Sequence, residues 1–323
     1  MGDVERQGLT YFTELPGGEL LALLSRPGVA RLLGRSGAAV SMAVLDLGQS
    51  RRRAVALLEE HDVPVTAWLV LDREDGYWLT ADNPELARRQ YHRVRDWAWQ
   101  HDLGVEAVGL DIEIPLDDSV ALMEQGSRAL WRLMQRRRSV EQVRGAARQY
   151  AELVEEIRAD GLRTETYQYF MILDDRMARS TLLQRVLGIV DLSADREVLM
   201  LYRSILPGLL GELLVDAFGP EAGGIGVGIT GGGVEALQGY FQRRELDLPQ
   251  LLVELRRARR HTRHVYVFSL EGCVDGGYLE ELCQADLAEH APGARLARLA
   301  SPARAVLRTM LRAERLWDRF HKR

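Results

Sequence analysis

The hydrophobic positions of the chain follow two alternating patterns. Short runs rich in Val, Ile, Leu and aromatic residues alternate with longer segments in which apolar residues recur every three or four positions. The short runs predict eight strands: GLTYFT (8–13), AVSMAVLDL (39–47), PVTAWLVL (64–71), VEAVGLDIE (105–113), TETYQYFMI (164–172), EVLMLYR (197–203), GIGVGI (224–229) and HVYVFSL (264–270). Eight alternating strands and helices are typical of the α/β class and favour a single (β/α)8 TIM barrel.

The connections predict one departure from a regular barrel. Helices are expected over 50–61, with Ser50 as cap, and over 84–101, where Asn83 precedes Pro84. The segment after the fourth strand, about 116–162, is longer than a return path needs and holds two helical patterns, 119–139 and 140–161. We therefore expect a helical insertion after strand 4, near the barrel mouth.

Residues 1–323 are expected to form one domain. No internal repeat, Pro-rich linker or low-complexity tract marks a boundary, and the tail predicts a closing amphipathic helix over about 303–320. Hydrophobic residues make up 46% and charged residues 28% of the 323, which suits a globular chain with an ample core.

Charge and residue usage exclude several classes of function. The net charge of −5 gives no support for a nucleic-acid surface, and the basic runs QRRRS (135–139) and LRRARRHTRH (255–264) are local. The one lysine, Lys322, lies at the end of the chain, so Schiff-base chemistry is not expected.

Metal, cofactor and membrane sites are also not expected. The seven histidines are scattered, and the two cysteines, Cys273 and Cys283, lack the second pair that a zinc site needs. There is no dinucleotide-binding or nucleophile-elbow motif. The first residues lack a leader pattern and no apolar run approaches about 18 residues, so we expect a cytoplasmic protein that does not bind membranes.

Two carboxylates end the fourth strand, in AVGLDIEIPLDD (107–118). Asp111 and Glu113 are two residues apart, so they point to the same face of the strand, at the end where TIM barrels carry their chemistry. Repulsion and burial raise the pKa of such a pair, and a carboxylic acid that stays protonated near neutral pH can protonate a glycosidic oxygen. The alternative is that both acids accept hydrogen bonds at a strand end for structural reasons.

Three segments together resemble the chitinase-like family 18 glycoside hydrolases. GLDIEIP is similar to the family's strand-4 motif through Asp111, Glu113 and Pro115, and LMLYRS (199–204) is similar to its strand-6 motif through Met200 and Tyr202. YVFSLEG (266–272) resembles the strand-8 segment, with Phe268 in place of a tryptophan that forms the floor of the sugar site.

The resemblance implies roles for these residues. Glu113 would be the general acid/base, Asp111 would orient a 2-acetamido group of the substrate, and Tyr202 would donate a hydrogen bond to that group. The chain departs from the family at Gly109, which replaces the first aspartate of the motif, and at Arg203, where the family usually has aspartate. These departures leave the N-acetyl requirement open, and muramidase-like barrels with a bare D-x-E strand fit the same residues.

Neighbouring strand ends supply further candidates for binding a carbohydrate or a glycosylated small molecule. LDREDGYWLTADN (71–83) places acids and aromatic rings beyond strand 3, where rings can stack on sugars and acids can bind hydroxyls. The candidate substrate-binding residues are Asp46, Asp72, Glu74, Tyr77, Trp78, Met200, Arg203, Phe268 and Glu271.

The main rival interpretation is a sugar-phosphate enzyme. GVGITGGGVEAL (226–237) follows strand 7, and its glycines Gly231–Gly233, with a helix beginning near Gly233 or Val234, are typical of loops that bind phosphate in TIM barrels. A glycine-rich tight turn explains the same run without a ligand. A barrel that binds carbohydrate without catalysis is the third possibility.

Overall fold

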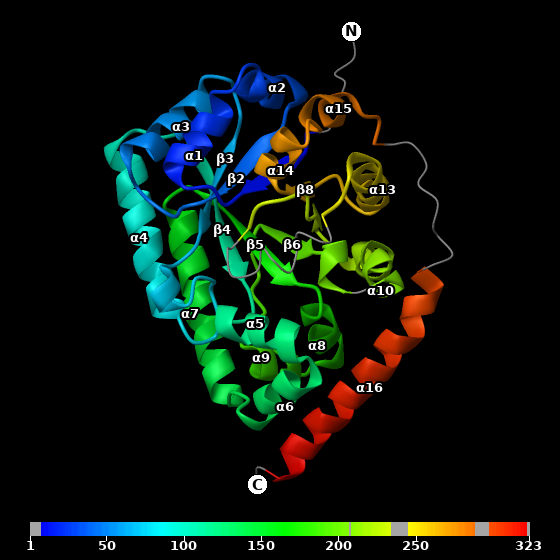
Figure 1. Ribbon diagram of the computed structural model, residues 1–323. Coiled ribbons are helices and arrows are strands. Elements are labelled where there is room, and N and C mark those ends of the chain that lie inside the picture. The colour runs from blue at the N-terminus through cyan, green and yellow to red at the C-terminus, as the bar shows by residue number, and fades with distance from the viewer. Residues whose placement is uncertain (1–7, 207, 234–244, 288–296, 322–323) are drawn as a thin grey trace.

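The chain forms a closed barrel of eight parallel strands (Figure 1). The computed structural model describes residues 8–206, 208–233, 245–287 and 297–321. The strands are β1 (Thr10–Thr13), β2 (Ala39–Ala43), β3 (Val65–Leu69), β4 (Val105–Ile112), β5 (Arg163–Tyr169), β6 (Arg196–Met200), β7 (Gly224–Gly228) and β8 (Val265–Phe268). Each strand pairs with the next, and β8 pairs with β1, so the predicted TIM barrel is confirmed.

Several strands end earlier than their apolar runs predict. β2 ends at Ala43, where the N–H of Leu45 bonds the Ala43 carbonyl in a turn, and β6 ends at Met200, shortly before the 3-10 helix η2 (Arg203–Ile205). The apolar residues beyond these points belong to loops that pack over the barrel mouth, so burial continues where strand pairing stops.

Helices surround the barrel. They are α1 (Gly17–Leu24), α2 (Val29–Ser36), α3 (Gln49–Glu59), α4 (Pro84–Gln100), α5 (Leu116–Gln125), α6 (Ser127–Gln135), α7 (Val140–Ala159), α8 (Ile172–Ala178), α9 (Leu182–Leu187), α10 (Leu209–Glu212), α11 (Leu214–Phe218), α13 (Leu248–Arg259), α14 (Leu270–Asp275), α15 (Leu279–Gln284) and α16 (Ala297–His321), with short 3-10 turns η1 (Arg73–Asp75) and η3 (Gly219–Glu221). α4 begins at Pro84 as predicted, whereas α3 begins at Gln49, one residue before the predicted cap Ser50. Among the described residues, no helix combines the length and apolar character needed to cross a membrane.

The segment after β4 contains three helices where the sequence pattern predicts two. Gly126, with φ 52° and ψ −120°, separates α5 from α6, because this backbone conformation cannot continue a helix. α7 begins at a capping box in which the side chains of Ser139 and Gln142 bond each other's backbone N–H. α5 therefore lies as a separate short helix at the barrel mouth (Figure 1).

The C-terminal helix α16 is longer than the predicted 303–320 and runs along the outside of the barrel against α8 and α9 (Figure 1). Buried Asp174 of α8 accepts hydrogen bonds from Arg304 (3.1 Å) and Arg308 (2.6 Å). Charge pairing at a buried carboxylate thus fixes this helix on the barrel.

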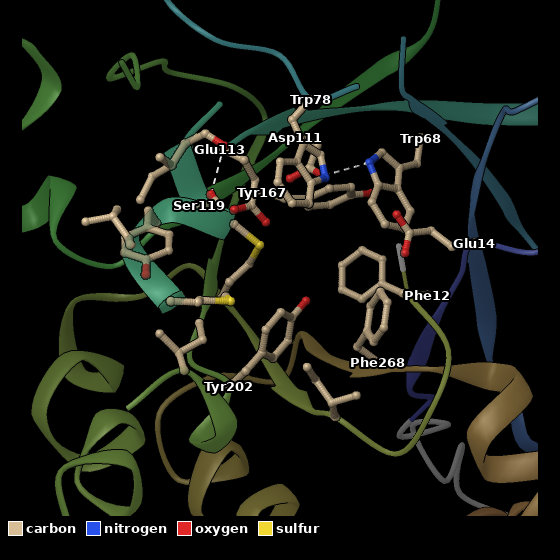
Figure 2. A pocket seen from close by; sticks show the side chains of 18 of the residues that line it. Phe12, Glu14, Trp68, Trp78, Asp111, Glu113, Ser119, Tyr167, Tyr202 and Phe268 are labelled. Atoms are coloured by element: carbon tan, nitrogen blue, oxygen red, sulfur yellow. Dashed lines mark hydrogen bonds between the residues drawn. The ribbon is translucent and has the colours of Figure 1, made fainter. Parts of the chain in front are cut away.

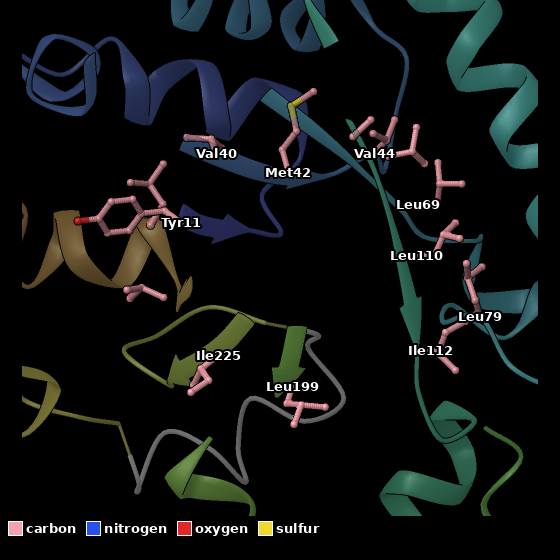
Figure 3. Close-up of a cluster of buried hydrophobic side chains, with 14 of the residues drawn as sticks. Tyr11, Val40, Met42, Val44, Leu69, Leu79, Leu110, Ile112, Leu199 and Ile225 are labelled. Atoms are coloured by element: carbon pink, nitrogen blue, oxygen red, sulfur yellow. The ribbon is translucent and has the colours of Figure 1, made fainter. Parts of the chain in front are cut away.

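The strands divide their side chains between two faces with a period of two. Outward residues such as Tyr11, Met42, Leu110 and Ile225 pack under the helices (Figure 3).

The two cysteines do not form a disulfide. Buried Cys273 and half-buried Cys283 are free thiols.

Inward residues fill the lower barrel with a polar network. Buried Glu165 accepts hydrogen bonds from Arg196 (2.9 Å), Tyr266 (2.8 Å) and Tyr167 (3.2 Å), and the Tyr167 hydroxyl lies 2.6 Å from that of Ser41. These bonds close the bottom of the barrel, so the open space lies at the opposite, carboxyl-terminal end.

Candidate active site

A cavity of about 260 Å³ opens at the carboxyl-terminal ends of the strands (Figure 2). Its wall combines aromatic rings, three carboxylates and a group of aliphatic side chains. The lining residues are Phe12, Glu14, Trp68, Trp78, Asp111, Glu113, Ile114, Ser119, Leu122, Met123, Tyr167, Tyr169, Met200, Tyr202, Ile205, Leu206, Ile229, Gly233 and Phe268.

The end of β4 is held by a segment from the preceding loop. The N–H of Leu79 bonds the Asp111 carbonyl (3.0 Å), and the N–H of Glu113 bonds the Leu79 carbonyl (3.1 Å). This short parallel bridge extends β4 by its backbone, so Asp111 and Glu113 keep their alternation and both side chains face the cavity.

Asp111 is the more deeply placed acid, with 1% of its surface exposed. Its Oδ2 accepts a hydrogen bond from the indole N–H of Trp68 (3.1 Å), while its buried Oδ1 has no hydrogen-bond partner among the described residues. Burial and the neighbouring Glu113 and Glu14 raise the pKa of Asp111 well above its usual value, against the opposing effect of Trp68. Oδ1 is therefore available to a polar hydrogen of a ligand.

Glu113 lies closer to the cavity opening. Burial, and next the charge of Glu14, raise the pKa of Glu113 to about 8. A carboxyl group with this pKa is mostly protonated at neutral pH, which is the state that a general acid requires.

Glu14 is a third carboxylate of the cavity, and it is not among the residues predicted from the sequence. It follows β1 directly, and its carboxylate accepts a hydrogen bond of 2.8 Å from the hydroxyl of Tyr77. Burial raises the pKa of Glu14 to about 7, with Tyr77 lowering it and Glu271 raising it. Phe12 and Glu14 repeat the same-face spacing of Asp111 and Glu113, and that spacing was the signal available in the sequence.

Aromatic rings form one side of the cavity. Phe12, Trp68 and Phe268 pack together, with ring centroids 5.5 Å apart for Phe12 and Trp68 and 6.4 Å apart for Trp68 and Phe268. Tyr202 lies 5.9 Å from Phe268, and Figure 2 shows its hydroxyl pointing into the cavity. Burial and then the charges of Asp111 and Glu113 raise the pKa of Tyr202 well above its usual value, so the hydroxyl remains a hydrogen-bond donor.

A glycine on β7 makes room for that tyrosine. A Cβ at Gly226 would lie 3.2 Å from Cε1 of the Tyr202 ring, a tighter contact than side chains normally make. Of the remaining sequence-predicted residues, Met200 and Trp78 also line the cavity.

Other predicted binding residues have structural contacts elsewhere. Arg203 forms an ion pair with Glu212 (2.6 Å). Asp46 accepts hydrogen bonds from the backbone N–H of Gly17 (2.8 Å) and from Arg51 (3.0 Å), which ties the start of α1 to α3. These contacts account for Arg203 and Asp46 without a ligand, and neither residue lines the cavity.

The loop after β3 contributes less than its composition suggests. Asp72 and Glu74 are exposed and do not line the cavity. Asp72 and Tyr77 border a second, smaller hollow, and Tyr77 also packs against the aromatic cluster of the cavity wall and bonds Glu14. Side chains in a loop do not alternate between two faces as they do in a strand, so the sequence pattern does not predict which of them face the cavity.

The glycine-rich loop after β7 has acidic neighbours. Gly231, Gly232 and Gly233 all have positive φ (142°, 78° and 88°), and a side chain at Gly232 would collide with the carboxylate of Glu271. Glu271 therefore lies beside this loop and not in the cavity wall. Its side chain is buried, and burial raises its pKa to about 7. A carboxylate at this place disfavours a phosphate, and the helix expected near Gly233 or Val234 falls in 234–244, outside the described residues.

Within the described ranges, no cluster of three or more His, Cys, Asp or Glu side chains is arranged to hold a metal ion. The carboxyl groups that line the cavity are suited to exchange protons with an organic ligand or to accept hydrogen bonds from it.

The raised pKa values make stability depend on pH. Glu14, with a pKa of about 7, holds its proton between pH 5 and 7, where an unfolded chain with a glutamate pKa of about 4.3 has released it. The stabilisation is complete below the unfolded pKa and is lost as pH rises through 7. We expect Glu14→Gln to be more stable than the wild type at pH 8, by about 1–3 kcal/mol, and to lose this advantage by pH 5.

Thermal and denaturant unfolding at pH 5 and pH 8 measure this difference. Glu74→Gln is the matched control because Glu74 is exposed and lies outside the cavity. Equal pH dependence in the wild type and in Glu14→Gln would contradict the burial of a titrating carboxyl at position 14.

Solved structures share this barrel at low sequence identity. The glycoside hydrolase domain of PgaB (BpsB) from Bordetella bronchiseptica is 9% identical with a TM-score of 0.50, and the match covers 85% of this chain and 98% of that one. A GH18 chitinase from Pseudoalteromonas aurantia is 10% identical with a TM-score of 0.46, covering 86% and 99%. Gas2p of Saccharomyces cerevisiae, solved with laminaripentaose, is 12% identical with a TM-score of 0.47, covering 91% and 67%.

A putative aldo-keto reductase (11% identical, TM-score 0.43) and a D-allulose 3-epimerase (13% identical, TM-score 0.42) are also similar. No family model and no curated protein matches the sequence. At 9% identity and a TM-score of 0.50, the likeness to the PgaB domain shows the TIM-barrel fold alone, a fold that many classes of enzyme share.

Proposed function

We propose that the protein is a glycoside hydrolase in which Glu113 is the general acid/base and Asp111 is the orienting or stabilising carboxylate. The observation that carries the proposal is the pairing of Glu113, whose pKa is raised to about 8, with a buried Asp111 whose Oδ1 has no partner among the described residues, both on one cavity wall. Aromatic rings suited to stacking on a sugar lie on the same cavity.

The reaction begins with a proton transfer. Glu113 donates its proton to the glycosidic oxygen as the bond from that oxygen to the anomeric carbon breaks. Positive charge then develops on the sugar ring, and the negative charge that the proton transfer leaves on Glu113 stabilises it. In the second half of the reaction the Glu113 carboxylate removes a proton from the incoming water, which restores the starting state.

Other groups on the wall orient the sugar. Asp111 Oδ1 accepts an N–H or O–H of the substrate, which includes the 2-acetamido group implied by the resemblance to family 18. Tyr202 donates from its protonated hydroxyl, and Glu14 accepts sugar hydroxyls beside Tyr77. The combination of tyrosine hydroxyls with three carboxyl groups suits a ligand rich in hydroxyl groups.

A screen of chromogenic glycosides, with and without an N-acetyl group at the second carbon, tests the proposal. We expect hydrolysis of at least one sugar, with activity falling above about pH 8 as Glu113 loses its proton. Binding of sugars without turnover of any of them would support a carbohydrate-binding barrel and contradict an enzyme.

A further inference from the structure

One side of the cavity is built from aliphatic side chains. Leu122 and Met123 come from α5, and Ile205 and Leu206 come from the end of η2 and the residue after it. All four are partly exposed, and buried Ile114, two residues beyond β4, also lines the cavity. Two segments about eighty residues apart in sequence thus present apolar surface to the same enclosed space, which is typical of a site for an apolar group.

The polar and aromatic groups that suit a sugar lie mainly on the other side. In Figure 2, Glu14, Trp68, Phe12 and Phe268 gather on one side of the cavity, while Ser119 of α5 lies on the other. Sugar rings stack their C–H faces on aromatic rings, and their hydroxyls need donors and acceptors. A sugar therefore fits the aromatic side, with Glu113 positioned between it and α5.

A second sugar is poorly matched to the aliphatic side. Leu122, Ile205 and Leu206 have no side-chain donor or acceptor, so hydroxyls placed against them would lose their bonds to water without replacement.

We propose that the substrate is a glycoside of an apolar alcohol, with the sugar on the aromatic side and the apolar group against Leu122, Met123, Ile205 and Leu206. The inference rests on the proposed function. Hydrolysis breaks the bond between the anomeric carbon and the glycosidic oxygen. That oxygen takes the proton of Glu113 and leaves as the apolar alcohol, while the oxygen of water bonds to the anomeric carbon and its proton passes to Glu113.

The experiment compares methyl, butyl, hexyl and octyl glycosides of glucose, galactose and N-acetylglucosamine with disaccharides of the same sugars. Each methylene that enters an apolar site strengthens binding by about fourfold. We expect kcat/KM to rise with chain length by on the order of 100-fold, to level off where the chain reaches solvent, and to exceed that of the disaccharide. A kcat/KM independent of chain length, or a preference for the disaccharide, would overturn the inference without contradicting the proposed glycosidase function.

Variants of the aliphatic side give a second readout. Leu122→Asn and Leu206→Asn should each reduce the ratio of octyl to methyl kcat/KM by about tenfold, because a polar amide replaces the apolar contact. Leu130→Asn is the matched control, since Leu130 is exposed on α6 and lies outside the cavity. An unchanged ratio in both cavity variants would contradict the proposed site.

Binding separates the two proposals. In Glu113→Gln, thermal stabilisation by octyl glycosides should exceed that by methyl glycosides, whether or not the wild type hydrolyses either. If no glycoside is hydrolysed but octyl glycosides stabilise the protein more than methyl glycosides do, the proposed glycosidase activity is wrong and the proposed binding of an apolar group is supported. If octyl and methyl glycosides stabilise equally, the inference falls.

Discussion

Replacing Glu113 with glutamine is expected to lower kcat on unactivated glycosides by about 10²- to 10⁴-fold, the range that general acid catalysis contributes. The amide keeps the shape of the carboxyl group, but it cannot deliver a proton to the glycosidic oxygen. Because the cavity wall is otherwise unchanged, KM should vary much less than kcat.

The leaving group provides the diagnostic comparison. A nitrophenolate leaves without protonation, so Glu113→Gln should retain much more activity on nitrophenyl glycosides than on alkyl glycosides. The wild-type fall in activity above about pH 8 should also disappear in the variant, since this fall reflects ionisation of Glu113. Glu74→Gln, an exposed acid outside the cavity, is the control. If Glu113→Gln hydrolysed alkyl glycosides as fast as the wild type does, Glu113 would not be the general acid and its role would be structural.

The barrel was predictable because its signals are local. Each strand is marked by its own apolar run, and Asp111 and Glu113 share a face in any extended strand. The closed parallel topology then brings Glu113, Tyr202 and Phe268 to one cavity, although they lie on β4, β6 and β8 regions far apart in sequence. Periodicity combined with the topology of the barrel thus accounts for part of the cavity lining.

The remainder of the site depends on contacts that no spacing encodes. The bond from Trp68 to Asp111 joins residues 43 positions apart, and nothing local marks Trp68 as its partner. Glu14 follows a strand of four residues, where alternation is a weak signal. Asp72 and Glu74 were predicted from a loop, whose backbone turns them to solvent.

The structure explains why Gly109 stands where the similar family 18 motif has an aspartate. A Cβ at this position would lie 2.7 Å from ring carbons of Tyr167. That ring is 1% exposed, lies 4.8 Å from the centroid of Phe12, and has its hydroxyl bonded to Ser41 and Glu165. The space that an aspartate of the motif would need is therefore filled by Tyr167.

Introducing the aspartate of the family 18 motif with Gly109→Asp should consequently destabilise the protein, by about 3 kcal/mol or more. Overpacking of a filled core costs about 1–3 kcal/mol, and burying another carboxylate beside Asp111 adds to it. We expect a lower melting temperature and a lower denaturant midpoint, with no gain in hydrolysis of N-acetyl sugars. A variant as stable as the wild type would show that Tyr167 moves freely.

A double-mutant cycle assigns that loss to the contact. Tyr167→Ala alone should cost about 3–5 kcal/mol because it leaves a cavity and removes one partner of Glu165. It also vacates the space beside Gly109, so the double variant should be less destabilised than the sum of the two single variants. Gly145→Ala in α7 is the control, since a Cβ there meets no atom within 4 Å and alanine favours a helix. Strictly additive losses would mean that Gly109 is required for the backbone of β4 and not for the packing of Tyr167.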